Sequence, residues 1–430
     1  MKDERKMSGQ VIKDLLKDTY FPPMYRVKQR FPRPRVEDIP ARIRDLLSRS
    51  EISETVRPGM EIAITCGSRG IANISLIIRE LCAFVADRGA KPFIIPAMGS
   101  HGGATAEGQQ AILESYGVTE TFCSAPIRSS MELTRIGMTE DGRDVLIDRH
   151  AAEADGIIVA GRVKPHTDFR GLYESGLMKM MVIGLGKHLG AEIFHQEGPR
   201  RMGTNLPMFG KAILKNAPIL FGLAMIENAY DETARIEAIP AHRIADEEPV
   251  LLEEARSLMA QSYIKEVDLL IIDRIGKDIS GDGMDPNITG RFSNPYVTGG
   301  MNAGKMAILD LTDESNGQMV GLGYGDVTTR RALAKCDFDA SIPNALISTA
   351  FTPFRIPLVF DSDRDAIAAC LKFNGEADQA NPRVIRIRDT MHMDQILVSE
   401  ALRDEVLQNP QMELIGDPEE FNFNQEGNLW

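Results

Sequence analysis

Short apolar runs typical of buried strands alternate along this chain with stretches that repeat apolar residues at helical spacing. Residues 60–65 form a strand-like run, a glycine turn follows at 67–70, and residues 71–88 place apolar side chains every three or four positions. The order of strand, loop and helix recurs over residues 91–116 and again from residue 156. We expect an α/β fold with mostly parallel sheets, because parallel strands need crossover helices that cover both faces.

The second half repeats this alternation of strands and helices after an amphipathic helix predicted over residues 242–263. The charged side chains of that helix, including Glu248, are expected on its polar side. Further strands are predicted at 267–272, 306–311 and 357–360, and helices at 327–335 and 361–373. We therefore predict two α/β domains, 1–264 and 265–430, with an active-site cleft between them. The first 55 or so residues are expected to be an arm packed on a neighbour, and residues 409–430 an acidic tail.

Composition limits the classes of partner and the cellular location that we expect for this protein. The chain has 430 residues and a net charge of −13, without a lysine or arginine run, so nucleic acid is not an expected partner. The five cysteines are widely spaced and form no CxxC pair, which favours a reducing, cytoplasmic location. No apolar stretch is long enough for a signal peptide or a membrane span, so no membrane association is expected. The sequence allows an oligomer.

Three of the seven histidines stand in glycine-marked stretches between residues 99 and 198. His101 lies between glycines and is followed by Gly102-Gly103, His166 follows Pro165 with Asp168 nearby to orient its ring, and His195 follows a helical segment. Imidazole either transfers protons near neutral pH or ligates metals, and both tasks are open here. The competing interpretation is a structural loop histidine. His188 is ambiguous, and the three remaining histidines are predicted at the surface: His150, His242 and His392.

The turn Gly67-Ser68-Arg69-Gly70 enters a predicted helix. Free backbone N–H groups, the positive end of the helix dipole and the Arg69 guanidinium suit a phosphate or a carboxylate. The alternative is an ordinary turn with a solvated arginine.

Lys179 lies within the apolar run 177–183, where a lysine either extends its amine to the surface or is desolvated and nucleophilic. Both interpretations stay open. The glycines of 184–190 have the wrong spacing for a dinucleotide fingerprint, so NAD binding is not expected.

Together, Ser68-Arg69, the glycine loop of His101, Lys164-Pro165-His166, Lys179 and His195 resemble the nickel-dependent lactate racemase family, the LarA-type racemases and epimerases of 2-hydroxy acids. The resemblance implies that His101 and His166 alternate as acid and base. It implies that Lys179 is joined covalently to a nickel-pincer nucleotide (pyridinium-3,5-bisthiocarboxylic acid mononucleotide nickel) and that His195 ligates the nickel. By the same analogy Arg69 contacts the substrate carboxylate, and Gly67, Ser68 and Gly70 are assigned to the cofactor.

Two segments depart from the family. Residues 167–178 are longer and bulkier than the family's glycine-rich stretch, so we expect a 2-hydroxy acid without specifying lactate. Arg170, if it points inward, would favour a second carboxylate or a polyol acid. In the second half, the loop 280–291 is rich in polar residues, and we expect Asn287, Thr289 and Arg291 to bind the substrate.

The leading hypothesis is thus a racemase or epimerase that acts on a small 2-hydroxy acid. The first alternative is a metal-dependent sugar-acid lyase or dehydratase that uses the same histidines with a simple divalent ion. The second is a non-catalytic carboxylate-binding protein. A covalent adduct on Lys179 discriminates among the three.

Overall fold

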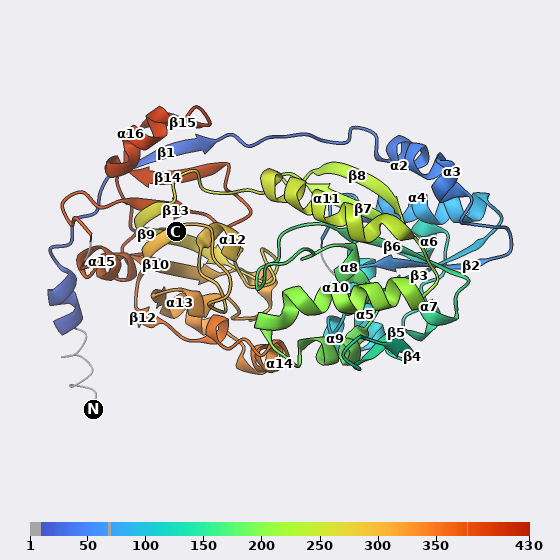
Figure 1. The fold of residues 1–430 in the computed structure, drawn as a ribbon. Helices are drawn as coiled ribbons and strands as arrows, with labels where there is room; N and C mark the ends of the chain where they lie inside the picture. Colours follow the sequence, from blue (N-terminus) through green and yellow to red (C-terminus); the bar gives the residue numbers. More distant parts are fainter. Residues whose placement is uncertain (1–9, 68–69, 376) are drawn as a thin grey trace. The chain divides into compact units, whose positions relative to one another are not determined.

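The computed structural model describes residues 10–67, 70–375 and 377–430 and confirms the α/β class. It forms two compact units (Figure 1). One unit is Pro32–Met259, and the other joins the described part of Met1–Phe31 to Ala260–Trp430. The chain passes from one unit to the other at residues 31–32 and returns at 259–260.

The unit Pro32–Met259 contains a sheet with the strand order β3-β2-β6-β7-β8. Neighbours from β3 to β7 are parallel, and β8 is antiparallel to β7. The strands are β2 (Glu61–Cys66), β3 (Lys91–Pro96), β6 (Gly156–Arg162), β7 (Ile219–Glu227) and β8 (Thr233–Pro240), with a separate hairpin of β4 (Leu133–Met138) and β5 (Asp144–Asp148).

Helices cover both faces of this sheet (Figure 1). Ile62 and Ile64 of β2 face one apolar cluster and Ala63 faces the other, and all three are fully buried, as expected for a strand covered on both sides. The helices are α2 (Ile39–Ser48), α3 (Ser50–Ser53), α4 (Ile74–Asp87), α5 (Ala106–Ser115), α6 (Glu120–Cys123), α7 (Arg149–Glu153), α8 (Leu177–Lys179), α9 (Lys187–His195), α10 (Pro199–Asn216) and α11 (Ile244–Leu258). Single turns are η1 (Gly102–Ala104), η2 (Met180–Gly184) and η3 (Ala241–Arg243).

The second unit contains a sheet with the order β12-β11-β10-β9-β13-β14-β1-β15, parallel from β12 to β13 and antiparallel beyond. Its strands are β1 (Met24–Gln29), β9 (Glu266–Ile275), β10 (Asn302–Leu311), β11 (Val327–Thr329), β12 (Leu358–Phe360), β13 (Val384–Ile387), β14 (Gln395–Ser399) and β15 (Met412–Glu419). Its helices and turns are α12 (Pro286–Thr289), α13 (Arg330–Ala334), α14 (Phe338–Ser348), α15 (Asp363–Lys372), α16 (Arg403–Gln408), η4 (Asp313–Ser315), η5 (Leu322–Tyr324), η6 (Thr352–Phe354) and η7 (Glu400–Leu402).

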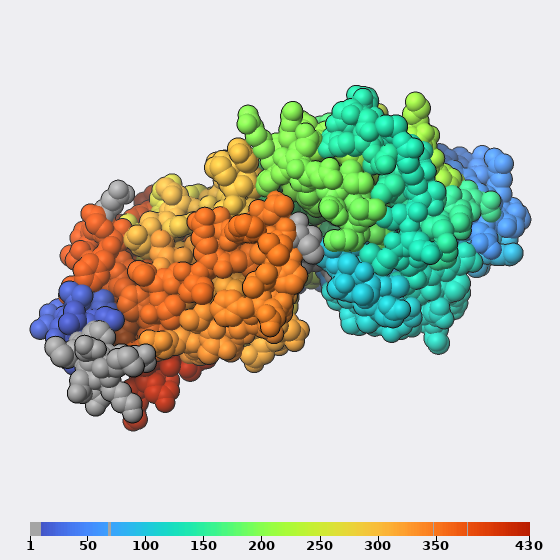
Figure 2. Space-filling view, turned by 90° about the horizontal axis from the view of Figure 1, so that it is seen from below, coloured from blue at the N-terminus to red at the C-terminus, as the bar shows by residue number. Residues whose placement is uncertain are grey.

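The two ends of the chain contribute paired strands to one sheet, whereas we expected an arm and a tail. Strand β1 lies between β14 and β15 (Figure 1), and its residues 24–29 pair with residues 412–419. In Figure 2 the first described residues, in dark blue, lie beside the orange and red segments of the same unit. Strand β15 escaped prediction because most of its side chains are exposed, so backbone pairing holds it at the sheet edge. The predicted helix at 327–335 also begins as a strand, β11.

Among the described residues, no helix is both long and apolar enough to span a lipid bilayer.

Candidate active site

Three candidate loops leave the same edge of one sheet. Strand β2 leads into the turn after Gly67, β3 into the loop of His101, and β6 into the loop of His166. These strands are parallel, so their carboxyl ends lie together, where ligands bind in open α/β sheets.

The segment α8–η2, which carries Lys179, packs against these strand ends. A Cβ atom added at Gly67 would lie 3.5 Å from Cε of Met180, and one added at Gly161 would lie 2.6 Å from Cγ of the same side chain. A Cβ at Gly99, in the His101 loop, would lie 3.2 Å from Ile183 of η2. The glycines therefore permit the close approach that brings the three loops to the lysine helix.

Lys179 and His166 are in direct contact. Nζ of Lys179 lies 2.7 Å from Nε2 of His166. The other ring nitrogen, Nδ1, accepts a hydrogen bond of 3.0 Å from the backbone N–H of Asp168. The protonation state that keeps both hydrogen bonds has the proton on Nε2 and a neutral Lys179 amine as its acceptor. A neutral amine is the nucleophilic form of lysine, so the contact favours the desolvated interpretation over an amine extended to solvent.

The imidazole of His166 is held neutral. Burial lowers its pKa well below 6.5, and the positive charges of Lys164 and Arg170 lower it further. The Phe169 ring packs over the imidazole with 4.4 Å between ring centroids. A neutral imidazole in an apolar setting is suited to accepting a proton.

The ring of His195 is held by a backbone carbonyl group. It ends α9, and its Nδ1 lies 2.6 Å from the carbonyl oxygen of Ala191. A carbonyl only accepts, so Nδ1 carries the proton and the lone pair of the neutral ring is on Nε2. Burial lowers the pKa of His195, and the Ala191 hydrogen bond opposes this shift. The contact between Lys179 and His166 places those two residues in one site.

A buried carboxylate, which the sequence analysis missed, holds the His166 loop. Oε2 of Glu174 accepts a hydrogen bond of 2.7 Å from the backbone N–H of His166, and Oε1 accepts one of 2.6 Å from Arg256 of α11. Arg170 donates to the carbonyl oxygen of His166 at 2.6 Å and lies 3.5 Å from Glu174. Arg170 thus holds the backbone of the loop itself.

Glu248 is a second buried carboxylate that sequence reasoning misplaced. We expected it on the polar face of its helix, but it is 1% exposed and accepts a hydrogen bond of 2.9 Å from the N–H of Met178. It thereby caps the start of α8 beside Lys179. Burial raises the pKa of Glu248 to about 8, although the backbone hydrogen bonds act in the opposite direction.

The remaining candidates fall into two groups. Gly67 and Gly70 flank the turn, while Ser68 and Arg69 lie outside the described residues. In the other unit, Nδ2 of Asn287 donates to Asp285, Thr289 is fully buried, and Arg291 pairs with Asp326 at 3.0 Å. Their roles toward substrate stay predictions.

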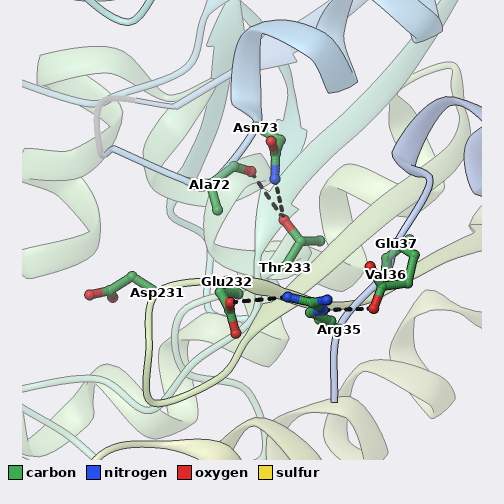
Figure 3. A pocket seen from close by; sticks show the side chains of 8 residues that line it. All are labelled: Arg35, Val36, Glu37, Ala72, Asn73, Asp231, Glu232 and Thr233. Carbon is green, nitrogen blue, oxygen red and sulfur yellow. Dashed lines mark hydrogen bonds and ion pairs between the residues drawn. The ribbon is translucent and has the colours of Figure 1, made fainter. Parts of the chain in front are cut away.

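A cavity of about 470 Å³ lies apart from these histidines in the same unit (Figure 3). None of the candidate residues lines it. Its polar groups already bind one another: Arg35 lies 2.6 Å from Glu37 and 3.9 Å from Glu232, and Thr233 accepts a hydrogen bond of 3.0 Å from Asn73 (Figure 3). Within the described ranges, no three His, Cys, Asp or Glu side chains form a ready-made metal site.

The fold and site thus define an α/β protein with a partly buried histidine and lysine in contact at the carboxyl ends of parallel strands. Residues 15–198 match the family model described as the lactate racemase N-terminal domain. The resemblance predicted from the sequence is thus confirmed as a match over this segment. It includes His101, His166, Lys179 and His195.

Solved structures also show similarity. One is a structural-genomics crystal structure of a protein from Thermotoga maritima, with 15% identity and a TM-score of 0.45, covering 65% of this chain and 71% of that one. Another is the lactate racemase apoprotein from Thermoanaerobacterium thermosaccharolyticum, with 14% identity and a TM-score of 0.42, covering 90% of this chain and 96% of that one. No curated protein matches the chain.

Proposed function

We propose that this protein is a racemase or epimerase of a 2-hydroxy acid, with His101 and His166 as its acid and base. The observation that carries the proposal is the 2.7 Å contact between Lys179 and His166, in a segment that matches the lactate racemase N-terminal domain model. In this proposal Lys179 is the attachment residue for a nickel-pincer nucleotide, and His195 is the nickel ligand.

The described residues fit that cofactor. The contact with His166 favours a neutral Lys179 amine, which is the form that becomes acylated. The Ala191 carbonyl fixes the His195 ring so that Nε2 is the available ligand atom. When bound, the metallated pyridinium supplies an acceptor for the substrate's C2 hydride.

Proton transfer is the task of the protein side chains. With that group bound, one histidine would take the substrate's hydroxyl proton as C2 is oxidised, and a histidine would return the proton to the oxygen as C2 is reduced on its other face. His166 has two partners for Nδ1 in Asp168: the backbone N–H at 3.0 Å and the carboxylate at 4.0 Å. The backbone N–H suits a ring whose proton is on Nε2. The carboxylate suits a ring that carries a proton on Nδ1 and accepts a proton at Nε2.

The decisive test is intact-mass spectrometry with nickel analysis on protein made in cells that synthesise the cofactor. We expect a mass adduct that maps to Lys179, together with bound nickel. Lys179→Met should abolish the adduct, whereas Lys211→Met, at an exposed helix position, should retain it. Absence of both adduct and nickel in the wild-type protein would refute the proposal.

The acid and base roles are tested by racemisation assays on a panel of 2-hydroxy acids. We expect His101→Ala and His166→Ala each to abolish racemisation without loss of the fold, and His242→Ala, at an exposed position, to be fully active. Full activity in either of the first two variants would remove that residue from the acid and base pair.

A further inference from the structure

Lys187 is a fully buried cation with no part in the chemistry proposed above. It is the first residue of α9 and adopts a left-handed backbone conformation with φ of 51°. Its Nζ lies 3.0 Å from Oδ2 of Asp148, which is also fully buried, and donates to the carbonyl oxygen of Pro96 at the end of β3. The third partner of the amine is Oε1 of Gln109, at 3.3 Å.

Gln109 connects this ion pair to the loop of His101. The side chain is fully buried in α5, and its Nε2 donates to the carbonyl oxygens of Gly99 at 2.9 Å and His101 at 3.2 Å. One amide group therefore accepts from the buried lysine and donates to both sides of the loop residue Ser100. Lys187 itself holds the residue at which β3 ends and the loop begins.

Stability alone does not account for such an arrangement. Removing two charges from water costs several kcal/mol per ion, and apolar pairs of similar volume are often equally stable or more so. Burial lowers the pKa of Lys187, and only Asp148 opposes the shift. A buried polar network fixes a single geometry, because each donor and acceptor must meet its partner. Here the geometry that is fixed belongs to the His101 loop.

We propose that Gln109 and Lys187, anchored by Asp148, are positioning residues that set the His101 imidazole for proton transfer. The catalytic consequence rests on the proposed function, whereas the effect on the loop does not. The network acts on the loop backbone through Gly99 and His101 and contacts no reacting atom.

The test compares Gln109→Glu with Gln110→Glu. The first variant keeps an acceptor for Lys187 but replaces the amide donor, so that a carboxylate oxygen faces the carbonyls of Gly99 and His101. The second changes the half-buried neighbour on the same helix, whose side chain donates a hydrogen bond of 2.9 Å to Glu114. Hydrogen exchange followed by mass spectrometry is measured on peptides covering residues 97–106, and kcat and KM are measured on the loaded enzyme.

In Gln109→Glu we expect loop amide exchange to rise about tenfold or more while exchange in β2 and β6 is unchanged. Misplacement of a catalytic group by about 1 Å costs up to about 100-fold in rate, so we expect kcat to fall about 10- to 100-fold with KM changed less than about threefold. Gln110→Glu should match the wild-type protein in both measurements.

Unchanged loop exchange in Gln109→Glu would overturn the proposal, as would faster exchange with unchanged kcat. If the wild-type protein racemises no 2-hydroxy acid, the proposed function fails and the exchange result alone decides whether the network holds the loop. The double variant Lys187→Met with Asp148→Leu gives a second route: wild-type loop exchange in that folded variant would also overturn the proposal.

Discussion

His166 is placed where a single residue, Asp168, offers its Nδ1 a donor and an acceptor in turn. The backbone N–H at 3.0 Å suits one tautomer, and the carboxylate 4.0 Å away suits the other after a small rotation. A histidine that alternates between acid and base needs such a pair of partners.

Asp168→Asn tests this tautomer exchange. We expect kcat for racemisation to fall about 10- to 100-fold, the range for partners that orient a functional histidine, because the neutral amide is a weaker acceptor for an Nδ1 proton. Steady-state kinetics in both directions checks the prediction, with Asp87→Asn at an exposed position of α4 as the control. Wild-type kcat in Asp168→Asn would contradict it.

Glu248 gives the molecule a pH-dependent stability. Its pKa is raised from an ordinary value of 4.5 to about 8, so the folded protein holds a proton that the unfolded chain releases. This contribution is fully present below about pH 4.5 and is lost as the pH rises through about 8. We expect Glu248→Gln to remove that loss.

Urea unfolding between pH 5 and pH 9 measures the effect. The wild-type free energy of unfolding should decline by about 4 kcal/mol more than that of Glu248→Gln over this range. Glu253→Gln, on the exposed face of the same helix, should follow the wild-type curve. Parallel curves for the wild-type protein and Glu248→Gln would show that the carboxyl group is not the cause.

At the scale of elements, the His101 loop depends on its contact with α5. Gly102 and Gly103 both have φ of 66°. A Cβ atom at Gly102 would lie 2.6 Å from the backbone of Gly108 and Gln109, whereas a Cβ atom at Gly103 would have no other atom within 4 Å. Alanine at Gly103 therefore tests backbone strain alone, whereas alanine at Gly102 tests strain and packing together.

We expect Gly103→Ala to lower the free energy of unfolding by about 1–2 kcal/mol, the cost of a left-handed alanine. Gly102→Ala should cost clearly more and should also impair racemisation, because α5 and the loop must move apart. Thermal unfolding and kcat of both variants check this, and equal losses in the two variants would contradict the packing argument.

The sequence pattern predicted the elements that have both periodicity and burial, such as β2, α4, β3 and β6. It also singled out His195 and the contacting pair His166 and Lys179, because titratable side chains beside glycines are a local signal. Glu174, Glu248 and Gln109 leave no such signal. Their roles depend on contacts with residues that the fold brings near, and a glutamate in an amphipathic helix is ordinarily solvated.

At the scale of the whole molecule, the two ends of the chain complete one core. Phe21 packs edge-on against Phe421 and Phe423, with ring centroids 5.6 and 5.3 Å apart. We expect Phe21→Ala to destabilise that unit by about 1–3 kcal/mol through loss of these two contacts. Calorimetry against Phe373→Ala, at an exposed position, measures the difference, and equal melting temperatures would contradict it.

The pairing of β1 with β14 and β15 also affects the order in which the two units can fold during synthesis. Residues 24–29 are synthesised before their partners at 395–399 and 412–419, which follow only after the whole of Pro32–Met259 has been made. At a synthesis rate of about 5–20 residues per second, β1 has no partner strand for tens of seconds. The unit with the histidines and Lys179 is free to fold in that interval, so a nascent chain halted before residue 395 would carry the candidate site beside an unfinished sheet.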